Sequence, residues 1–169
     1  MDEMQITWER ASKIKGNNTL FGKGVSADDI YQGRVGNCWF LAAASAVADA
    51  DPGLVTKAFL NTDNQLNAAG IYAVDLYTLG VPHTVVVDDF MPRSVGDDGV
   101  KIENSFANVA ISDQSMWGAI LEKAFAKLVG NYMHTSGGIP SSGVRRIVGG
   151  AFELHPHIGM AVDALWKEL

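Results

Sequence analysis

The sequence has a single cysteine, Cys38, in a chain of 169 residues. One cysteine excludes an internal disulfide, and it matches no known cysteine ligand spacing of a zinc site. Cys38 is therefore a small buried residue, a reactive thiol, or both.

Positive charge and long apolar segments are also scarce. The chain has 13 lysine and arginine residues against 19 aspartate and glutamate residues, and its formal net charge is −6 at pH 7. Binding to nucleic-acid phosphates requires a basic surface, so this balance excludes nucleic acid as the expected partner. No apolar run approaches the roughly 20 residues that cross a bilayer, so no transmembrane segment is expected.

The amino-acid composition and the length of the chain are those of one globular domain. Hydrophobic residues make up 47% of the chain and charged residues 19%, which is typical of a folded domain. The length suits one substantial core, so residues 1 to 169 are predicted to form a single unit. The first residues, MDEMQITWER, contain no apolar signal-peptide core, which favours a cytoplasmic protein.

An irregular segment and then a helix are predicted at the start of the chain. Residues 1 to 28 include a glycine-punctuated stretch and are predicted to form an irregular arm. Residues 38 to 50, CWFLAAASAVADA, combine helix formers with apolar residues on nearly every face, which predicts a helix buried all round. Asp51, Pro52 and Gly53 are expected to end this helix.

Two runs of β-branched and aromatic residues follow, at 71 to 78 and 83 to 90. A Gly-Val-Pro turn separates them, so they predict a β-hairpin. Asp88 and Asp89 fall at the end of the second run. Because neighbouring side chains of a strand point to opposite faces, a structural role is expected for them rather than an acid–base pair. A loop is predicted over residues 93 to 111, with a short strand near residues 100 to 102.

The clearest amphipathic helix lies in SMWGAILEKAFAKLVG. Glu122 and Lys123 are expected to face outward from it, and Gly130 is expected to cap its end. Its apolar positions recur at steps of four and are Met116, Ile120, Ala124 and Leu128.

The last part of the sequence contains a glycine-rich stretch, which is followed by a predicted helix. The stretch HTSGGIPSSGVRRIVGG indicates several sites of positive φ or close backbone approach, with a short helical piece at residues 144 to 148. Residues 156 to 169 predict a helix without a stop signal, which is expected to lead to a further lobe. The whole pattern predicts an α+β fold dominated by helices.

The predicted helix start at Cys38 suits a nucleophile. A nucleophilic cysteine acts as its thiolate, which the partial positive charge of a helix N-terminus stabilises. The unpaired N–H groups there can also donate to an oxyanion on a substrate carbonyl. Gly33 and Gly36 keep the preceding loop clear of side chains, and Gln32 offers an amide donor to an oxyanion hole. An unrelated α+β domain with a buried cysteine is the alternative.

This combination resembles the calpain-like cysteine proteases, a branch of the papain-like superfamily. Their cysteine segment runs Asp-Ile-x-Gln-Gly-x-x-Gly-Asp-Cys-Trp before a helix rich in leucine and alanine, and here Asn37 replaces the second aspartate. The matching residues are Asp29, Ile30, Gln32, Gly33, Gly36, Cys38 and Trp39. Similar blocks are ITWER at 6 to 10, VVVDDFMP at 85 to 92, MWGAILEKAFAKLVGNY at 116 to 132 and SGGIPSSGVRRIVGG at 136 to 150.

The resemblance implies the left lobe of a papain-like fold, with a central helix starting at the cysteine and a small antiparallel hairpin. It implies that Cys38 is the nucleophile, that Gln32 is the oxyanion-hole amide, and that the backbone of Gly138 binds the extended substrate peptide. Such a lobe belongs to an intracellular endopeptidase that hydrolyses peptide bonds in protein substrates.

The resemblance also implies a missing partner. The catalytic His and Asn of the family lie in a second lobe, and neither of their segments is present in this sequence. The four histidines lie outside the matching motifs and are His83, His134, His155 and His157. The chain alone is therefore expected to be almost inactive, because a cysteine nucleophile needs a general base. A calpain-like module that has lost its triad and acts as a binding or regulatory scaffold is the alternative.

Calcium is a further implication of the resemblance. Calcium-activated members hold an ion in the first lobe with backbone carbonyls, an aspartate and a glutamate. Asp29 matches the aspartate, and Gly22 and Gly24 match carbonyl positions, but Ser115 stands where the glutamate is expected. Calcium needs several oxygen ligands, preferably including charged ones, so this site is expected to be lost or weak.

Overall fold

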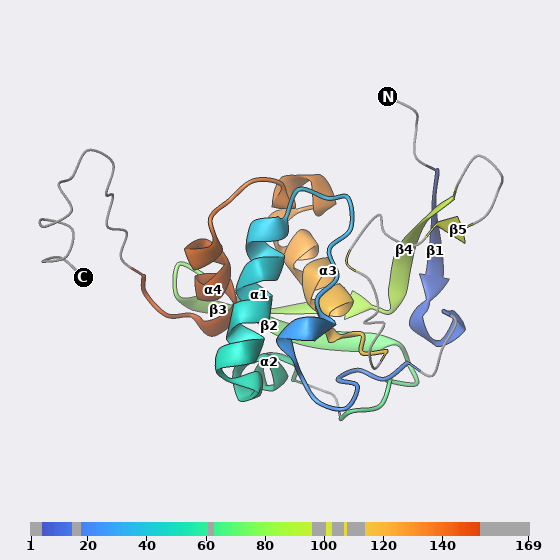
Figure 1. Ribbon diagram of the computed structural model, residues 1–169, viewed down its shortest axis with the longest axis horizontal. Helices are drawn as coiled ribbons and strands as arrows, with labels where there is room; N and C mark the ends of the chain where they lie inside the picture. Colours follow the sequence, from blue (N-terminus) through green and yellow to red (C-terminus); the bar gives the residue numbers. More distant parts are fainter. Residues whose placement is uncertain are drawn as a thin grey trace, which may run out of the picture.

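The computed structural model describes residues 5–14, 18–60, 63–95, 101–102, 107 and 114–152. Helices and a β-hairpin form the main body, and a second small sheet lies at one side of it (Figure 1). The fold class is α+β with helices dominant, as predicted. The predicted helix over 156 to 169 lies outside the described residues. Among the residues described, no helix is both long enough and apolar enough to cross a bilayer.

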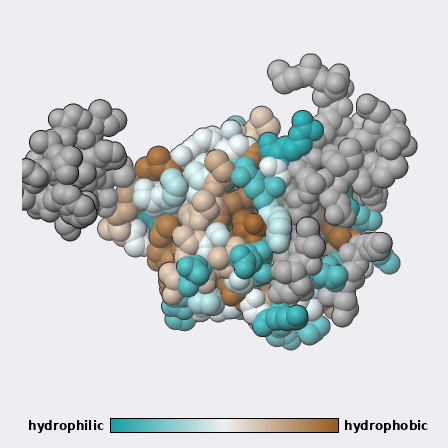
Figure 2. Space-filling view, in the orientation of Figure 1, coloured by the Kyte–Doolittle hydropathy of each residue, from teal (hydrophilic) through white to brown (hydrophobic). Residues whose placement is uncertain are grey.

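Helix α1 (Cys38–Ala50) starts and ends where it was predicted. The prediction that it is buried all round is wrong, because one stripe of the helix is exposed: Cys38, Ala42 and Ala46. Alanine favours a helix in water as well as in a core, so composition could not identify this open face. In the space-filling view, the surface over α1 and α4 is mostly pale to brown (Figure 2).

Helix α2 (Pro52–Ala58) begins at the residues that end α1. Asp51 accepts a hydrogen bond from the backbone N–H of Gly53 at 2.8 Å, and Pro52 occupies the first helical position. Aspartate at the N-cap and proline at the first position both favour a helix start. The predicted stop was therefore correct, but α2 was not predicted.

The hairpin consists of β2 (Ile71–Thr78) and β3 (Val81–Asp88), paired antiparallel. Leu79 and Gly80 form its turn with φ of 53° and 81°. Two positive φ angles are typical of a type I′ turn, which is shorter than the predicted Gly-Val-Pro turn. Burial alternates along β2, and its buried side chains face the core: Tyr72, Val74 and Leu76.

The second sheet has the order β1-β4-β5. Its strands are β1 (Gln5–Arg10), β4 (Phe90–Val95) and β5 (Lys101–Ile102). The prediction of an irregular arm over residues 1 to 28 is therefore wrong for β1. The predicted loop at 93 to 111 also starts too early, because β4 continues to Val95. The short strand expected near residues 100 to 102 is confirmed by β5. β1 pairs with a strand about 80 residues away, and no local pattern reveals such pairing.

Arg10 joins the second sheet to the hairpin. Its guanidinium Nη1 donates to Oδ1 of Asp89 at 2.8 Å, at the corner where β3 gives way to β4. The Arg10 guanidinium also lies over the ring of Phe90, 4.6 Å from its centroid. Asp89 is 3% exposed, so its charge is neutralised inside the protein. The structural role expected for Asp89 is confirmed.

Helix α3 (Trp117–Val129) ends at Gly130 with φ of 112°, as predicted. Helix α4 (Pro140–Val148) is longer than the helical piece predicted at 144 to 148. Helix α1 packs against α4 and α3, and these two pack against the hairpin (Figure 1). The short 3-10 helices are η1 (Ala11–Lys13), η2 (Ala27–Asp29) and η3 (Tyr132–Thr135).

Candidate active site

Cys38 is the first residue of α1, and it is exposed. The N–H groups of the first turn have no acceptor within a helix. Asn37 occupies the N-cap position, but its side chain makes no capping hydrogen bond to this turn. The thiol therefore lies at the positive end of the helix and is open to solvent. The alternative of a buried structural cysteine is wrong.

Gln32 lies in the loop that leads into Cys38. Its side chain is exposed, and Nε2 donates to the carbonyl of Val35 at 3.1 Å. The backbone N–H of Asn37 donates to the same carbonyl at 2.9 Å. The loop is thus folded tightly around the Val35 oxygen, with the Gln32 amide on its surface.

Gly138 reaches the start of α1 from a loop about 100 residues further along the chain. Trp39 donates from Nε1 to the carbonyl of Thr135 at 2.9 Å, and the backbone N–H of Gly137 donates to the carbonyl of Gly36 at 3.0 Å. A Cβ atom on Gly138 would lie under 3.0 Å from the Trp39 indole. Two glycine-containing loops therefore run side by side next to the thiol.

Glu122 was predicted to face outward, and this prediction is wrong. The side chain is 1% exposed and points from α3 toward the start of α1. Oε1 accepts from Nδ2 of Asn37 at 2.6 Å, and Oε2 accepts from the backbone N–H of Ala107 at 2.9 Å. Burial raises the pKa of Glu122, and the two hydrogen bonds oppose this rise.

Lys123, the next residue of α3, forms an ion pair with Asp88. Lys123 and Lys127 also donate to backbone carbonyls of Phe90 and Val86. Burial alone would raise the pKa of Asp88, but hydrogen bonds from Lys123 and Phe90 and the nearby positive charges bring it below its usual range. The structural role expected for Asp88 is confirmed.

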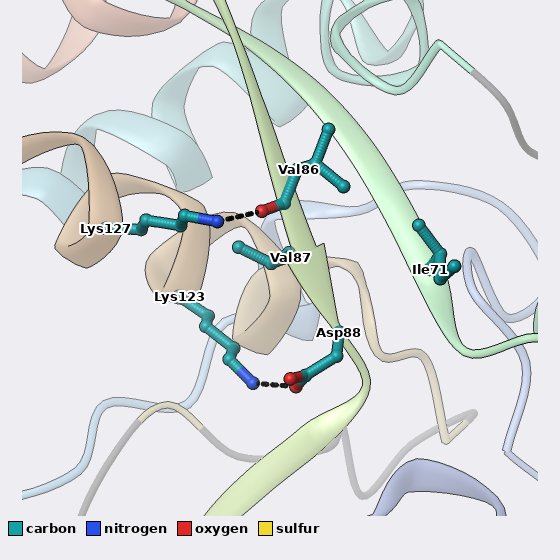
Figure 3. A pocket seen from close by; sticks show the side chains of 6 residues that line it. All are labelled: Ile71, Val86, Val87, Asp88, Lys123 and Lys127. Atoms are coloured by element: carbon teal, nitrogen blue, oxygen red, sulfur yellow. Dashed lines mark hydrogen bonds and ion pairs between the residues drawn. The ribbon is translucent and has the colours of Figure 1, made fainter.

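A pocket lies between these two lysines and the hairpin (Figure 3). The residues that line it are Ile71, Val86, Val87, Asp88, Lys123 and Lys127. None of the predicted site residues lines this pocket. The candidate active site is instead the open surface at the start of α1.

Two of the residues matched to calcium ligands, Asp29 and Gly22, already have structural partners. Asp29 is 3% exposed, and its Oδ2 accepts from the backbone N–H of Ser26 at 2.9 Å and from Nε1 of Trp117 at 2.8 Å. The carbonyl of Gly22 accepts from Nδ2 of Asn64 at 2.8 Å. In the described part of the chain, no group of three or more His, Cys, Asp or Glu side chains is placed to hold a metal ion.

Sequence reasoning missed the contact between Asn37 and Glu122. Asn37 was noted only as a replacement for aspartate, and Glu122 was expected on the surface. The signal available in the sequence was weak: Leu121, Glu122, Phe125 and Ala126 place a glutamate within a wide apolar band. All four of these residues are buried.

Comparison with known proteins agrees with this architecture. A model of the calpain family cysteine proteases matches residues 1–169. Calpain-5 of Caenorhabditis elegans is 34% identical over 153 residues, which cover 88% of this chain and 22% of that protein. The human calpain-2 catalytic subunit is 34% identical over 148 residues, which cover 88% of this chain and 20% of that protein.

Mouse calpain-5 gives a similar result. It is 32% identical over 155 residues, which cover 88% of this chain and 23% of that protein. The chain thus spans about a fifth of the length of the curated relatives it matches. Because the family model matches along the whole sequence, the chain belongs to the calpain family of cysteine proteases.

Proposed function

We propose that this chain is the nucleophile-bearing lobe of an intracellular, cytoplasmic cysteine endopeptidase. The observation that carries the proposal is the exposed thiol of Cys38 on the first residue of α1. A helix N-terminus stabilises both the attacking thiolate and negative charge that develops beside it. The family membership supports protein or peptide substrates.

Peptide hydrolysis would begin with attack of the Cys38 thiolate on the scissile carbonyl carbon. The carbonyl oxygen becomes an oxyanion, which accepts hydrogen bonds from the Cys38 N–H and the Gln32 amide. For this role the Gln32 amide must turn from the Val35 carbonyl, which it now contacts at 3.1 Å, toward the substrate. The C–N bond then breaks, the amine leaves with a proton, and water hydrolyses the thioester.

The proton transfers in this scheme require a base, and the family's His and Asn segments are not in this sequence. We propose that a second lobe supplies the His and Asn, and that the chain alone is almost inactive. Of the described histidines, His83 lies on β3, and His134 lies in η3 with its Nδ1 3.0 Å from the carbonyl oxygen of Val129. A second lobe would instead meet the open surface at the start of α1.

Gly138 is proposed to bind the backbone of the extended substrate. Its loop runs beside the Cys38 loop, as the hydrogen bond from Gly137 to the carbonyl of Gly36 indicates. The Trp39 indole fills the direction that a Gly138 side chain would take, so the backbone of Gly138 is the part proposed to bind the substrate strand.

Calcium is proposed to bind this chain weakly or not at all. The Asp29 carboxylate and the Gly22 carbonyl are engaged in hydrogen bonds, and Ser115 contributes no charge. A hard divalent cation is poorly matched by such a donor set. Calorimetric titration of the chain with calcium should show weak binding or none, and micromolar binding would contradict this proposal.

Covalent labelling tests the proposed function. The chain is combined with a second lobe that carries His and Asn, in trans or in the full gene, and is treated with a thiol-directed epoxide inhibitor. Mass spectrometry should find the adduct on Cys38, and Cys38→Ser serves as the control. Absence of an adduct would contradict the proposal and favour a regulatory scaffold without activity.

A further inference from the structure

Asn37, which directly precedes the thiol, is fully buried and lies at the start of α1. Its backbone angles are φ of −108° and ψ of 24°, in the sparsely populated bridge region. Its carbonyl accepts from the N–H groups of Phe40 at 2.9 Å and Leu41 at 3.2 Å. The backbone carbonyl of Asn37 therefore takes part in the hydrogen bonding of α1, whereas its side chain points away from this helix.

The side chain of Asn37 points to α3 instead. Nδ2 donates to Oε1 of Glu122 at 2.6 Å, and the Glu122 side chain is itself 1% exposed. The Ala107 N–H satisfies the other carboxylate oxygen at 2.9 Å. A short contact between two buried polar groups fixes the direction of both side chains, because leaving either of them unpaired is costly.

This direction is unusual for an asparagine at an N-cap. Asparagine is among the strongest N-cap residues, because its Oδ1 accepts from an N–H group of the first turn. Here Oδ1 has no hydrogen-bond partner within the described residues, so the Asn37 side chain does not cap the first turn. The contact with Glu122 thus holds the Asn37 side chain away from α1. Without this contact, the side chain could accept a hydrogen bond from an N–H group of the first turn, next to the thiol.

We propose that Glu122 is a positioning residue for the nucleophile. By binding the Asn37 amide, it prevents this side chain from capping α1. The first-turn N–H groups that the Asn37 carbonyl does not bind then stay available to the Cys38 thiolate and to a substrate oxyanion. The inference rests on the proposed role of Cys38, but the thiolate part can be measured without a second lobe or a substrate.

Two neutral substitutions at Glu122 isolate the contact. Glu122→Gln can keep both hydrogen bonds: its carbonyl accepts from Ala107, and its amide donates to Oδ1 of an Asn37 side chain turned over. Glu122→Ala removes the contact and leaves Asn37 free to cap the helix. Because both substitutions remove the same charge, a difference between them does not come from the charge.

The readout is alkylation of Cys38, the only cysteine of the chain. Rates with neutral iodoacetamide and anionic iodoacetate are measured as a function of pH. Near neutral pH, Cys38 of Glu122→Ala should be alkylated about fivefold more slowly than Cys38 of Glu122→Gln. The ratio of the iodoacetate rate to the iodoacetamide rate should also be lower in Glu122→Ala. A purely structural role would lower the urea midpoint and leave the ratio of the two rates unchanged.

Rescue by a second substitution sharpens the test. Glu122→Ala combined with Asn37→Ala removes the competing cap, so alkylation should return to within about twofold of the Glu122→Gln rate. Removal of both polar partners also leaves no unpaired side chain between them, which favours folding. Equal rates in Glu122→Ala and Glu122→Gln, or no rescue in the double variant, would overturn the proposal.

A matched pair at Asn37 covers the case in which Glu122→Ala does not fold. Serine is also a capping residue but is shorter than asparagine, so Asn37→Ser should slow alkylation relative to Asn37→Ala. Circular dichroism and urea unfolding establish folding of each variant. Equal rates in this pair, or failure of every variant to fold, would overturn the proposal.

Failure of the proposed protease function would give a different result. The wild-type chain would then react normally with the alkylating reagents, but the epoxide inhibitor would never label it.

Discussion

Gly138 lies directly against the indole of Trp39, with no space for a side chain between them. A methyl group added there would lie under 3.0 Å from the ring, so the ring or the loop must move. Gly138→Ala is expected to lower the free energy of unfolding by about 1–3 kcal/mol, as overpacking does elsewhere. It should also slow Cys38 alkylation, because Trp39 is adjacent to the thiol. Urea unfolding and alkylation rates measure the two effects.

Gly150→Ala is the matched control for this prediction. Gly150 is exposed, and the nearest atom to an added Cβ is Cγ2 of Val148 at 3.7 Å, which is ordinary contact. Its stability and alkylation rate should stay at wild-type values. Equal losses in the two variants would mean that the contact with Trp39 is not the cause.

Leu79→Asn is expected to stabilise the hairpin. Leu79 has φ of 53° in the turn and is 80% exposed, so the leucine is strained and buries little surface. Asparagine tolerates positive φ and is favoured before glycine in this turn type, which predicts a gain of about 0.5–1 kcal/mol. Thermal and urea unfolding provide the measurement. Leu60→Asn makes the same exchange at an exposed residue without positive φ, and it should give no gain.

Asp29→Ala is expected to destabilise the chain by about 2–4 kcal/mol, because it leaves the buried Trp117 indole N–H and the Ser26 N–H without their acceptor. Asp28→Ala is the control, since Asp28 is an exposed carboxylate in the same short helix. Urea unfolding compares the two variants. Similar small losses in both would contradict a structural role for the Asp29 carboxylate.

The buried carboxyl group of Glu122 should make stability depend on pH. Burial raises its pKa, so the folded chain binds this proton more tightly than the unfolded chain does. The free energy of unfolding should therefore fall as pH rises from the ordinary glutamate range to the raised pKa, and then level off. Glu122→Gln should remove this slope. Urea unfolding at several pH values between about 4 and 8 measures it.

Tyr132 and Asp88, whose pKa values are also shifted, titrate outside this window. Burial, followed by the charges of Glu122 and Asp88, raises the pKa of Tyr132, so this phenol stays neutral throughout. Asp88 has a lowered pKa, so its stabilising effect is lost only at pH below the ordinary aspartate range. The exposed Asp49→Asn serves as control. An unchanged slope in Glu122→Gln would contradict the assignment.

Much of the fold could be predicted because its signals are local. The bounds of α1, the hairpin and the Gly130 cap depend on neighbouring residues, and all three are confirmed. The strand β1 and the buried position of Glu122 depend on partners about 80 residues away. Sequence periodicity carries no information about such partners, so these features were predicted wrongly.

In the candidate site too, features with local signals could be predicted, and features set by distant packing could not. Cys38 could be placed at the start of a helix, because the alanine-rich run begins there. The approach of Gly138 to Trp39 is set by the packing of two distant loops. The turning of Asn37 away from its own helix is likewise set by α3, and a capping preference alone would predict the opposite direction.

The ion pair of Arg10 with Asp89 limits how far the chain can be shortened. A version that starts after Arg10 would lose β1 and would leave the Asp89 carboxylate, which is 3% exposed, without its counter-charge. The loss of stability would therefore begin around Asp89, at the corner between the hairpin and β4, rather than at the new N-terminus. A minimal folding unit made from this lobe therefore has to retain its first strand, although that strand is remote from the thiol.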